Sequence, residues 1–220
     1  MAYASLTNAF AITSITLEIR PAAPDGLLLF NKQANANGRD FIGVRLQNGF
    51  VEFAYNLGGG TLTLVSSEPL QLNEWHTVEV HRSGRNGQLI IDSSLPVTGL
   101  SPEGYDSLQL GDPLYIGGIE DSASNNVPVE FRAGGYHGCV RRVSVGSTPL
   151  MLISEAVNGE RVGECPCIPN PCPYSGVCYE KTRDGETQQQ CVCSIPFTGD
   201  LCTERESINY CKPQPHYYFP

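Results

Sequence analysis

The stretch Glu164-Cys165-Pro166-Cys167 decides how this chain is organised, because two cysteines one residue apart must belong to different covalent units. Upstream of it the chain has only Cys139, so Cys165 has one candidate partner. Pro166 fixes its own φ and restricts the residue before it to extended conformations, so the joint between the two units is expected to be rigid. Downstream lies a set of six cysteines: Cys167, Cys172, Cys178, Cys191, Cys193 and Cys202.

The composition fits one domain with a large core followed by a small satellite. The chain has 220 residues, of which 40% are apolar, and nine are cysteines. Cysteines that cluster with adhesion-module spacings indicate oxidised pairs and an extracellular setting. A cytosolic zinc protein is the alternative, but zinc ligands are normally separated by two to four residues, whereas the close pairs here are separated by one.

The net charge of −9 weighs against a nucleic-acid partner and against a surface that strongly attracts heparin. No apolar run is long enough to span a membrane, so direct membrane insertion is not expected. The first basic residue is Arg20 and no secretory signal is visible, so an extracellular protein with this sequence is expected to be a fragment of a longer chain.

Short alternating segments separated by turn signals dominate the chain up to residue 165, which is typical of antiparallel sheets with one wet face. Asn48-Gly49 and Asn86-Gly87 are strong hairpin signals. The run 27–30 is apolar on both faces and is predicted to be a central strand. We expect an all-β jelly-roll sandwich with strands near 15–20, 27–30, 41–46, 51–55, 62–65, 78–82, 89–91, 114–116 and 140–145, and at most a turn of helix at 154–157.

Six short motifs in this order resemble the landmarks of a laminin G-like domain over about residues 3–165. They are Asp25-Gly26-Leu27-Leu28, Asp40-Phe41-Ile42-Gly43-Val44, Tyr55-Asn56-Leu57-Gly58-Gly59-Gly60, Asn73-Glu74-Trp75-His76-Thr77-Val78, Tyr115-Ile116-Gly117-Gly118 and Gly138-Cys139-Val140. The resemblance implies a two-sheet jelly roll over residues 1–165 with a terminal disulfide. A Cys139–Cys165 bond closes a loop of 26 residues, worth about 3–4 kcal/mol on the chain-entropy estimate.

Residues 166–203 resemble an EGF-like module in their cysteine spacing. Six cysteines permit 15 connectivities. The resemblance implies one of these, with the pairs Cys167–Cys178, Cys172–Cys191 and Cys193–Cys202. Residues 204–220 are interpreted as the start of a following module or a tail, with Cys211 as its first half-cystine; an engineered or interchain thiol is the alternative.

Catalysis is not expected. The four histidines lie in no motif that pairs them with a nucleophile, and neither a nucleophile elbow nor a metalloprotease helix is present. Trp75 is the only tryptophan and is predicted to pack in the core.

Laminin G-like domains often hold calcium at the rim of the sandwich, and such a site needs hard oxygen ligands. Aligned with that pattern, the two side-chain ligand positions fall on Thr61 and Gly111, and the two carbonyl donors on about Val78 and Gln109. Both side-chain ligands are therefore missing, so we expect no cofactor and no tight calcium site. Asp112 is the one candidate ligand, and calcium binding through its carboxylate would contradict this expectation.

Arginines supply the candidate surface for a glycan or protein partner. Arg82 and Arg85 flank a hairpin turn and are candidates to form a patch with Arg132 or one of the pair Arg141 and Arg142. Adjacent residues of a regular strand point to opposite faces, so Arg141 and Arg142 should not form one patch by themselves. The alternative is that all five are simply solvated.

The resemblance implies a non-catalytic, secreted module of a basement-membrane proteoglycan. Such a module presents a surface to a cell receptor, a matrix protein or, in one version, a sulphated glycan. Three alternatives remain at this point: a calcium-dependent cell-adhesion domain, a structural spacer without a ligand, and, most remotely, a secreted hydrolase.

Overall fold

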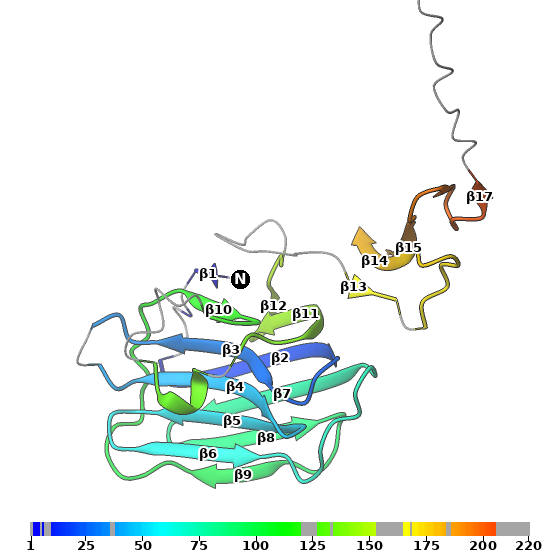
Figure 1. Ribbon diagram of the computed structural model, residues 1–220. Coiled ribbons are helices and arrows are strands. Elements are labelled where there is room, and N and C mark those ends of the chain that lie inside the picture. The colour runs from blue at the N-terminus through cyan, green and yellow to red at the C-terminus, as the bar shows by residue number, and fades with distance from the viewer. Residues whose placement is uncertain are drawn as a thin grey trace, which may run out of the picture. The chain divides into compact units, whose positions relative to one another are not determined.

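The chain forms two compact units, residues 1–163 and residues 164–220, in the computed structural model shown in Figure 1. The structure describes residues 2–4, 6, 10–35, 38–119, 127–132, 134–152, 165–167, 169–183 and 186–205. The boundary between the units lies two residues before the one drawn from the sequence. The helix turn expected at 154–157 and Cys211 lie outside the described residues.

The first unit is a sandwich of two antiparallel sheets, each with six strands among the described residues. The β3 sheet has the order β1 (Ala2–Tyr3), β10 (Leu114–Ile116), β3 (Gly26–Lys32), β4 (Phe41–Gln47), β5 (Phe50–Asn56) and β6 (Thr61–Val65). The β2 sheet has the order β12 (Thr148–Pro149), β11 (Gly138–Val145), β2 (Ile12–Pro21), β7 (His76–Ser83), β8 (Asn86–Ile91) and β9 (Val97–Leu100). The predicted all-β sandwich is confirmed.

The main core lies between the two sheets and is filled by alternate residues of their strands. In β2, for example, Ile15, Leu17 and Ile19 are at most 1% exposed, while the residues between them face outward. This alternation is what a strand with one buried face requires. The described part of the chain contains no helix that is long and apolar enough to cross a membrane.

A second, smaller core covers the outer face of the β3 sheet. The 3-10 helix η2 (Val129–Phe131) places the Phe131 ring 5.4 Å from that of Phe30 and 5.5 Å from that of Phe41. Leu27 and Phe30 belong to this outer cluster, whereas Leu28 and Leu29 belong to the main core. The doubly apolar run predicted to form a central strand is therefore buried on both faces, because η2 covers the second one.

A β-bulge interrupts the pairing of β11 with β2. Val140 pairs with Ile19 and Arg142 with Glu18, so Arg141 is an extra residue without an opposite partner in the ladder. A bulge rotates the chain by one residue relative to regular alternation. As a consequence Arg141 and Arg142 are both exposed, and the inward positions resume at Val143, which is fully buried.

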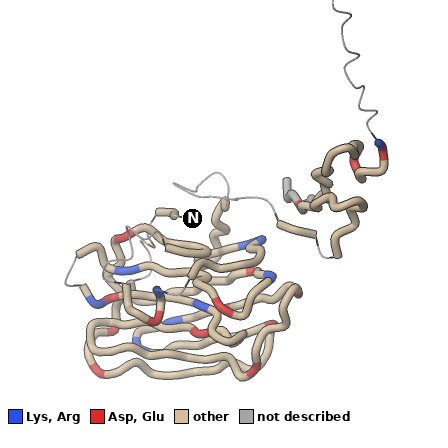
Figure 2. The backbone as a smooth tube through the Cα atoms, in the orientation of Figure 1, with Lys and Arg blue, Asp and Glu red and all other residues tan. Residues whose placement is uncertain are grey.

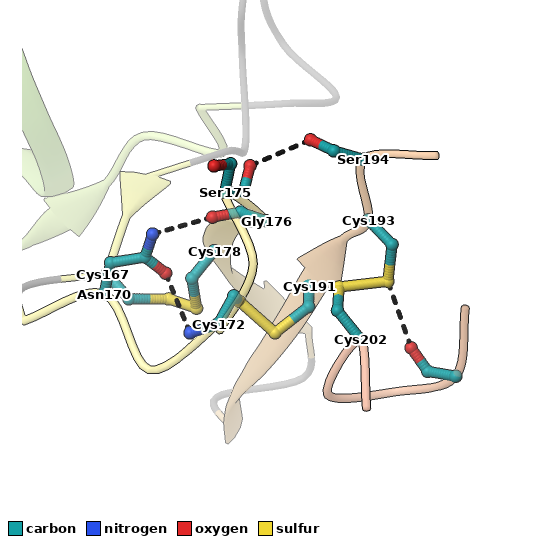
Figure 3. The surroundings of a disulfide bond; sticks show 11 residues. Cys167, Asn170, Cys172, Ser175, Gly176, Cys178, Cys191, Cys193, Ser194 and Cys202 are labelled. Atoms are coloured by element: carbon teal, nitrogen blue, oxygen red, sulfur yellow. Dashed lines mark hydrogen bonds between the residues drawn. A yellow bond between two sulfur atoms is a disulfide. The ribbon is translucent and has the colours of Figure 1, made fainter. Parts of the chain in front are cut away.

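The second unit is held by disulfides around the sheet β13 (Cys165–Pro166), β14 (Val177–Arg183) and β15 (Glu186–Val192), followed by the pair β16 (Phe197–Thr198) and β17 (Glu204–Arg205). Its bonds Cys167–Cys178, Cys172–Cys191 and Cys193–Cys202 are those that the resemblance implies (Figure 3). The unit fits an EGF-like module, whose buried residues are mainly the cystines themselves.

Two further contacts order the loop that begins this module. The Asn170 side chain donates from Nδ2 to the carbonyl of Gly176 at 2.8 Å and accepts from the backbone N–H of Cys172 at 3.0 Å (Figure 3). Cys139 and Cys165 are each disulfide-bonded. Their pairing with each other stays a prediction from the sequence.

Candidate functional site

The outer face of the β2 sheet carries two exposed arginines on a fixed support. Glu18 of β2 accepts from Arg141 Nε at 2.6 Å through one carboxylate oxygen and from Arg142 Nη1 at 3.1 Å through the other. The Glu18 side chain is only 17% exposed, while those of Arg141 and Arg142 are 49% and 64% exposed. One carboxylate thus orients two cations, leaving a net positive charge at the surface.

Trp75 contacts Arg141 and a third arginine, Arg20. The guanidinium carbon of Arg141 is 4.4 Å from the centre of its ring, and that of the buried Arg20 is 5.2 Å away. Both distances are within the range of cation–π attraction. The expectation that Trp75 packs in the core is wrong: the residue is half-buried and belongs to neither hydrophobic cluster of the sandwich.

The segment before β7 is tied down on both sides of Trp75. The His76 ring bonds Asp92 at 2.6 Å through Nδ1 and the carbonyl of Gln71 at 2.9 Å through Nε2. The second oxygen of Asp92 accepts the backbone N–H of Thr77 at 2.7 Å. The tryptophan is therefore supported by a fixed backbone, and we call Glu18, Trp75, Arg141 and Arg142 together the arginine platform.

The structure corrects the prediction that Arg141 and Arg142 point to opposite faces. That prediction assumed regular alternation, and the bulge in β11 adds one residue where the two arginines lie. Nothing in the sequence of Val140-Arg141-Arg142-Val143 marks a bulge, because the extra residue is another arginine rather than a glycine.

The prediction that Arg82 contributes to a binding surface is wrong. Its side chain points inward and is 1% exposed. The guanidinium donates to the carbonyls of Gly84, Phe10 and Asp106 at 2.8, 2.9 and 3.2 Å and to Thr13 Oγ1 at 3.3 Å. Burial lowers the pKa of Arg82 below its usual value. Its role is to fasten three loops at one end of the β2 sheet.

Arg85 and Arg132 do not join the arginine platform either. Arg85 donates from Nε and Nη2 to the carbonyl of Ser101 at 3.0 and 2.7 Å. Arg132 is exposed next to η2, where its Nε donates to the carbonyl of Val127 at 2.8 Å. Since η2 covers the β3 sheet, Arg132 lies on the other side of the sandwich. Figure 2 shows basic and acidic residues interspersed over this unit.

The positions aligned with a calcium rim do not form a ligand set. Val78 is fully buried in the middle of β7, between β2 and β8, so its carbonyl is not at a rim. The Asp112 carboxylate is paired with Lys32 Nζ at 2.8 Å, and the N–H of Gly111 donates to the Lys32 carbonyl. Thr61 Oγ1 accepts from Asn56. The described residues contain no group of three or more acidic, histidine or cysteine side chains that could hold a metal ion.

Asp40 is the carboxylate that sequence reasoning missed at this rim. Its Oδ2 accepts the backbone N–H of Gln109 at 2.9 Å. Burial raises its pKa, an effect that the Gln109 N–H and the charge of Arg82 partly oppose. Asp40 belongs to a hollow of about 270 Å³ that also holds Lys32, Arg39, Asn56 and Glu130. The sequence did offer one signal for Asp40, because this residue begins the motif Asp40-Phe41-Ile42-Gly43-Val44 that leads into β4.

A second hollow, of about 200 Å³, lies on the outer face of the β2 sheet at the end where β7 turns into β8. It is lined by Ile12, Thr13, Ser14, His81, Arg82, Ser83, Asn86 and Gln88, of which Thr13 and Arg82 have buried side chains. We call the other six residues the polar groove. It shares one sheet face with the arginine platform, because Ser14 of the groove and Glu18 of the platform are both outward positions of β2.

The fold defines a two-sheet β-sandwich domain with an exposed basic surface, and the sequence assigns it to a family. The family model for the laminin G domain matches residues 19–151, which is more than half of the chain. The chain belongs to the laminin G domain family.

Its curated relatives include a basement-membrane proteoglycan. The chain is 35% identical over 211 residues to the mouse basement membrane-specific heparan sulfate proteoglycan core protein, covering 94% of this chain and 6% of the relative. It is 34% identical to bovine pikachurin, and the match covers 90% of this chain and 20% of pikachurin. It is 31% identical to mouse neurexin-2, and the match covers 90% of this chain and 12% of neurexin-2. The chain thus spans a fifth or less of the length of these relatives.

Solved laminin structures share the fold. Domains LG4-5 of the mouse laminin α1 chain match with a TM-score of 0.59 at 30% identity, covering 74% of this chain and 43% of that one. The LG1-3 region of the laminin α2 chain matches with a TM-score of 0.56 at 21% identity, covering 68% and 31%, and supports the fold alone.

Proposed function

We propose that this chain is a non-catalytic, secreted binding module of a basement-membrane proteoglycan, and that the arginine platform presents two guanidinium groups to acidic groups of a cell receptor, matrix protein or glycan. The order of modules resembles the C-terminal region of perlecan and, next, that of agrin. The similarity to the mouse basement-membrane proteoglycan supports the setting.

The observation that carries the proposal is the shared carboxylate of Glu18. A lone surface arginine is mobile and well solvated, and its ion pairs contribute little. Here Nε of Arg141 and Nη1 of Arg142 are occupied by the support, so the remaining N–H groups are directed away from it. A preorganised pair of guanidiniums matches an oxyanion, which accepts charge-assisted bonds from both.

The test is binding of the 220-residue chain to surface-immobilised heparan sulphate and to immobilised laminin as a protein ligand, each at several salt concentrations. Arg141→Glu/Arg142→Glu should weaken binding at least about tenfold, and the remaining affinity should depend less on salt. The matched control is Arg39→Glu/Arg132→Glu, which changes the net charge equally at exposed arginines away from the platform. If both double variants lose the same affinity, the loss comes from the change in net charge alone, and the proposal is contradicted.

A calcium-dependent, neurexin-like adhesion domain is the second candidate function, and the relative neurexin-2 is the reason to test it. Calorimetric titration of the metal-stripped chain with calcium separates the two. Binding tighter than about 1 mM that is lost in Asp40→Ala or Asp112→Ala would favour the adhesion domain. If no heat is seen and neither ligand binds at any salt concentration, the chain acts as a structural spacer.

A further inference from the structure

We infer that the polar groove is a subsite for sugar hydroxyls of an acidic oligosaccharide, one of whose acidic groups is held by the arginine platform. The inference rests on the proposed function and restricts the class of ligand, because it selects a glycan rather than an acidic protein surface. It also assigns a role to residues of β2, β7 and β8 that neither motif matching nor charge had pointed to.

The exposed side chains of the groove offer hydrogen bonds, while the guanidinium of Arg82, which also lines the hollow, is bonded to backbone carbonyls. Asn86 and Gln88 carry amides, Ser14 and Ser83 carry hydroxyls, and within the described part of the chain none of these four side chains hydrogen-bonds to protein. Each can donate and accept. His81, whose Nε2 is 3.7 Å from Glu79, adds an imidazole at the same rim.

These groups match sugar hydroxyls, each of which also donates and accepts. A bound peptide strand would instead need a free sheet edge, and a helix an apolar groove. The groove lies in the middle of a sheet, where Ser83 pairs with Ile12 on one side and Asn86 on the other, so its backbone is already paired. Ile12, which is 65% exposed, offers an apolar contact for the C–H face of a sugar ring.

The distance between the two subsites suits a linear ligand. Glu18, Thr16 and Ser14 are successive outward residues of β2, and Ser14 pairs with His81 of the groove. Four residues of strand span about 13 Å at a rise of roughly 3.3 Å per residue. The residue between, Thr16, lies between Glu79 and Ser144 in the neighbouring strands, so the path is polar throughout.

The experiment compares size-defined heparan sulphate oligosaccharides by calorimetry, using a disaccharide and a hexasaccharide on the intact chain. Asn86→Ala/Gln88→Ala should weaken the hexasaccharide by about tenfold, as expected for the loss of two or so net hydrogen bonds. It should leave the disaccharide and the salt dependence unchanged, because no charge is altered. Gln47→Ala/Thr63→Ala, on the β3 sheet, is the matched control.

The outcomes separate the two proposals. If the arginine variant abolishes binding but the groove variant binds the hexasaccharide as the native chain does, the proposed function stands and the subsite is wrong. If neither variant changes binding, both proposals fail. An equal loss for the disaccharide and hexasaccharide would show that the groove variant disturbs the platform, which also overturns the subsite. Thermal melts of each variant show whether the sandwich remains folded.

Discussion

Replacing Arg82 with methionine removes a buried cation without leaving much empty space. Three carbonyls, those of Phe10, Gly84 and Asp106, and the hydroxyl of Thr13 lose a charged donor. A hydrogen bond to a charged group contributes about 1.5–3 kcal/mol net, but the variant also avoids the desolvation of the guanidinium. We expect a net loss of about 3–5 kcal/mol in the free energy of unfolding, because several buried acceptors, at about 1–3 kcal/mol each, are left without a donor.

Trp75 makes the measurement specific, since it is the only tryptophan and lies in the sandwich. Its fluorescence in urea follows unfolding of this unit without a contribution from the disulfide-rich one. Arg39→Met, at an exposed arginine, should change stability by less than about 0.5 kcal/mol. A loss below about 1 kcal/mol for Arg82→Met would refute the reasoning, because it would mean that the loops around residues 10, 84 and 106 do not depend on the guanidinium.

Three further changes test other parts of the structure. Gly43→Ala places a Cβ 2.5 Å from Phe131 Cε1 and should cost about 1–3 kcal/mol in a urea titration, whereas Gly134→Ala, with open space around it, should cost less than about 0.5 kcal/mol. Asp40→Asn should flatten the pH dependence of melting: burial raises the Asp40 pKa above 3.8, so native stability falls as pH rises from 3.8 through the raised value. Unchanged pH profiles would contradict this. Asn170→Ala should speed amide exchange at 170–176 by about tenfold, since two side-chain hydrogen bonds of about 0.5–1.5 kcal/mol each are lost. An unaltered rate would mean that the disulfides alone order this loop.

The sequence was sufficient for the fold because the fold depends on periodic patterns. The alternation Ile15, Leu17, Ile19 predicts a half-buried strand, and β2 is one. The hairpin signal at 48–49 falls at the turn between β4 and β5, whereas the turn of the second hairpin lies at 84–85 and Asn86-Gly87 begins β8. Motifs in their order identified the family, and cysteine spacing implied the bonds of the small unit. Such signals depend on residues that are close in the sequence, so they can be recognised without knowing which strands pair.

The candidate site depends on contacts between strands that are far apart in sequence, and there the sequence alone was misleading. Arg82 appeared to be a surface cation because arginines usually are, but carbonyls from three loops surround it. Arg141 and Arg142 share a face only because a bulge shifts the register against Ile19 and Glu18. Charge and residue type are written in the sequence. Which side of a sheet a residue faces, and which partner fixes it, is decided by register and packing between strands, and only the tertiary structure supplies these.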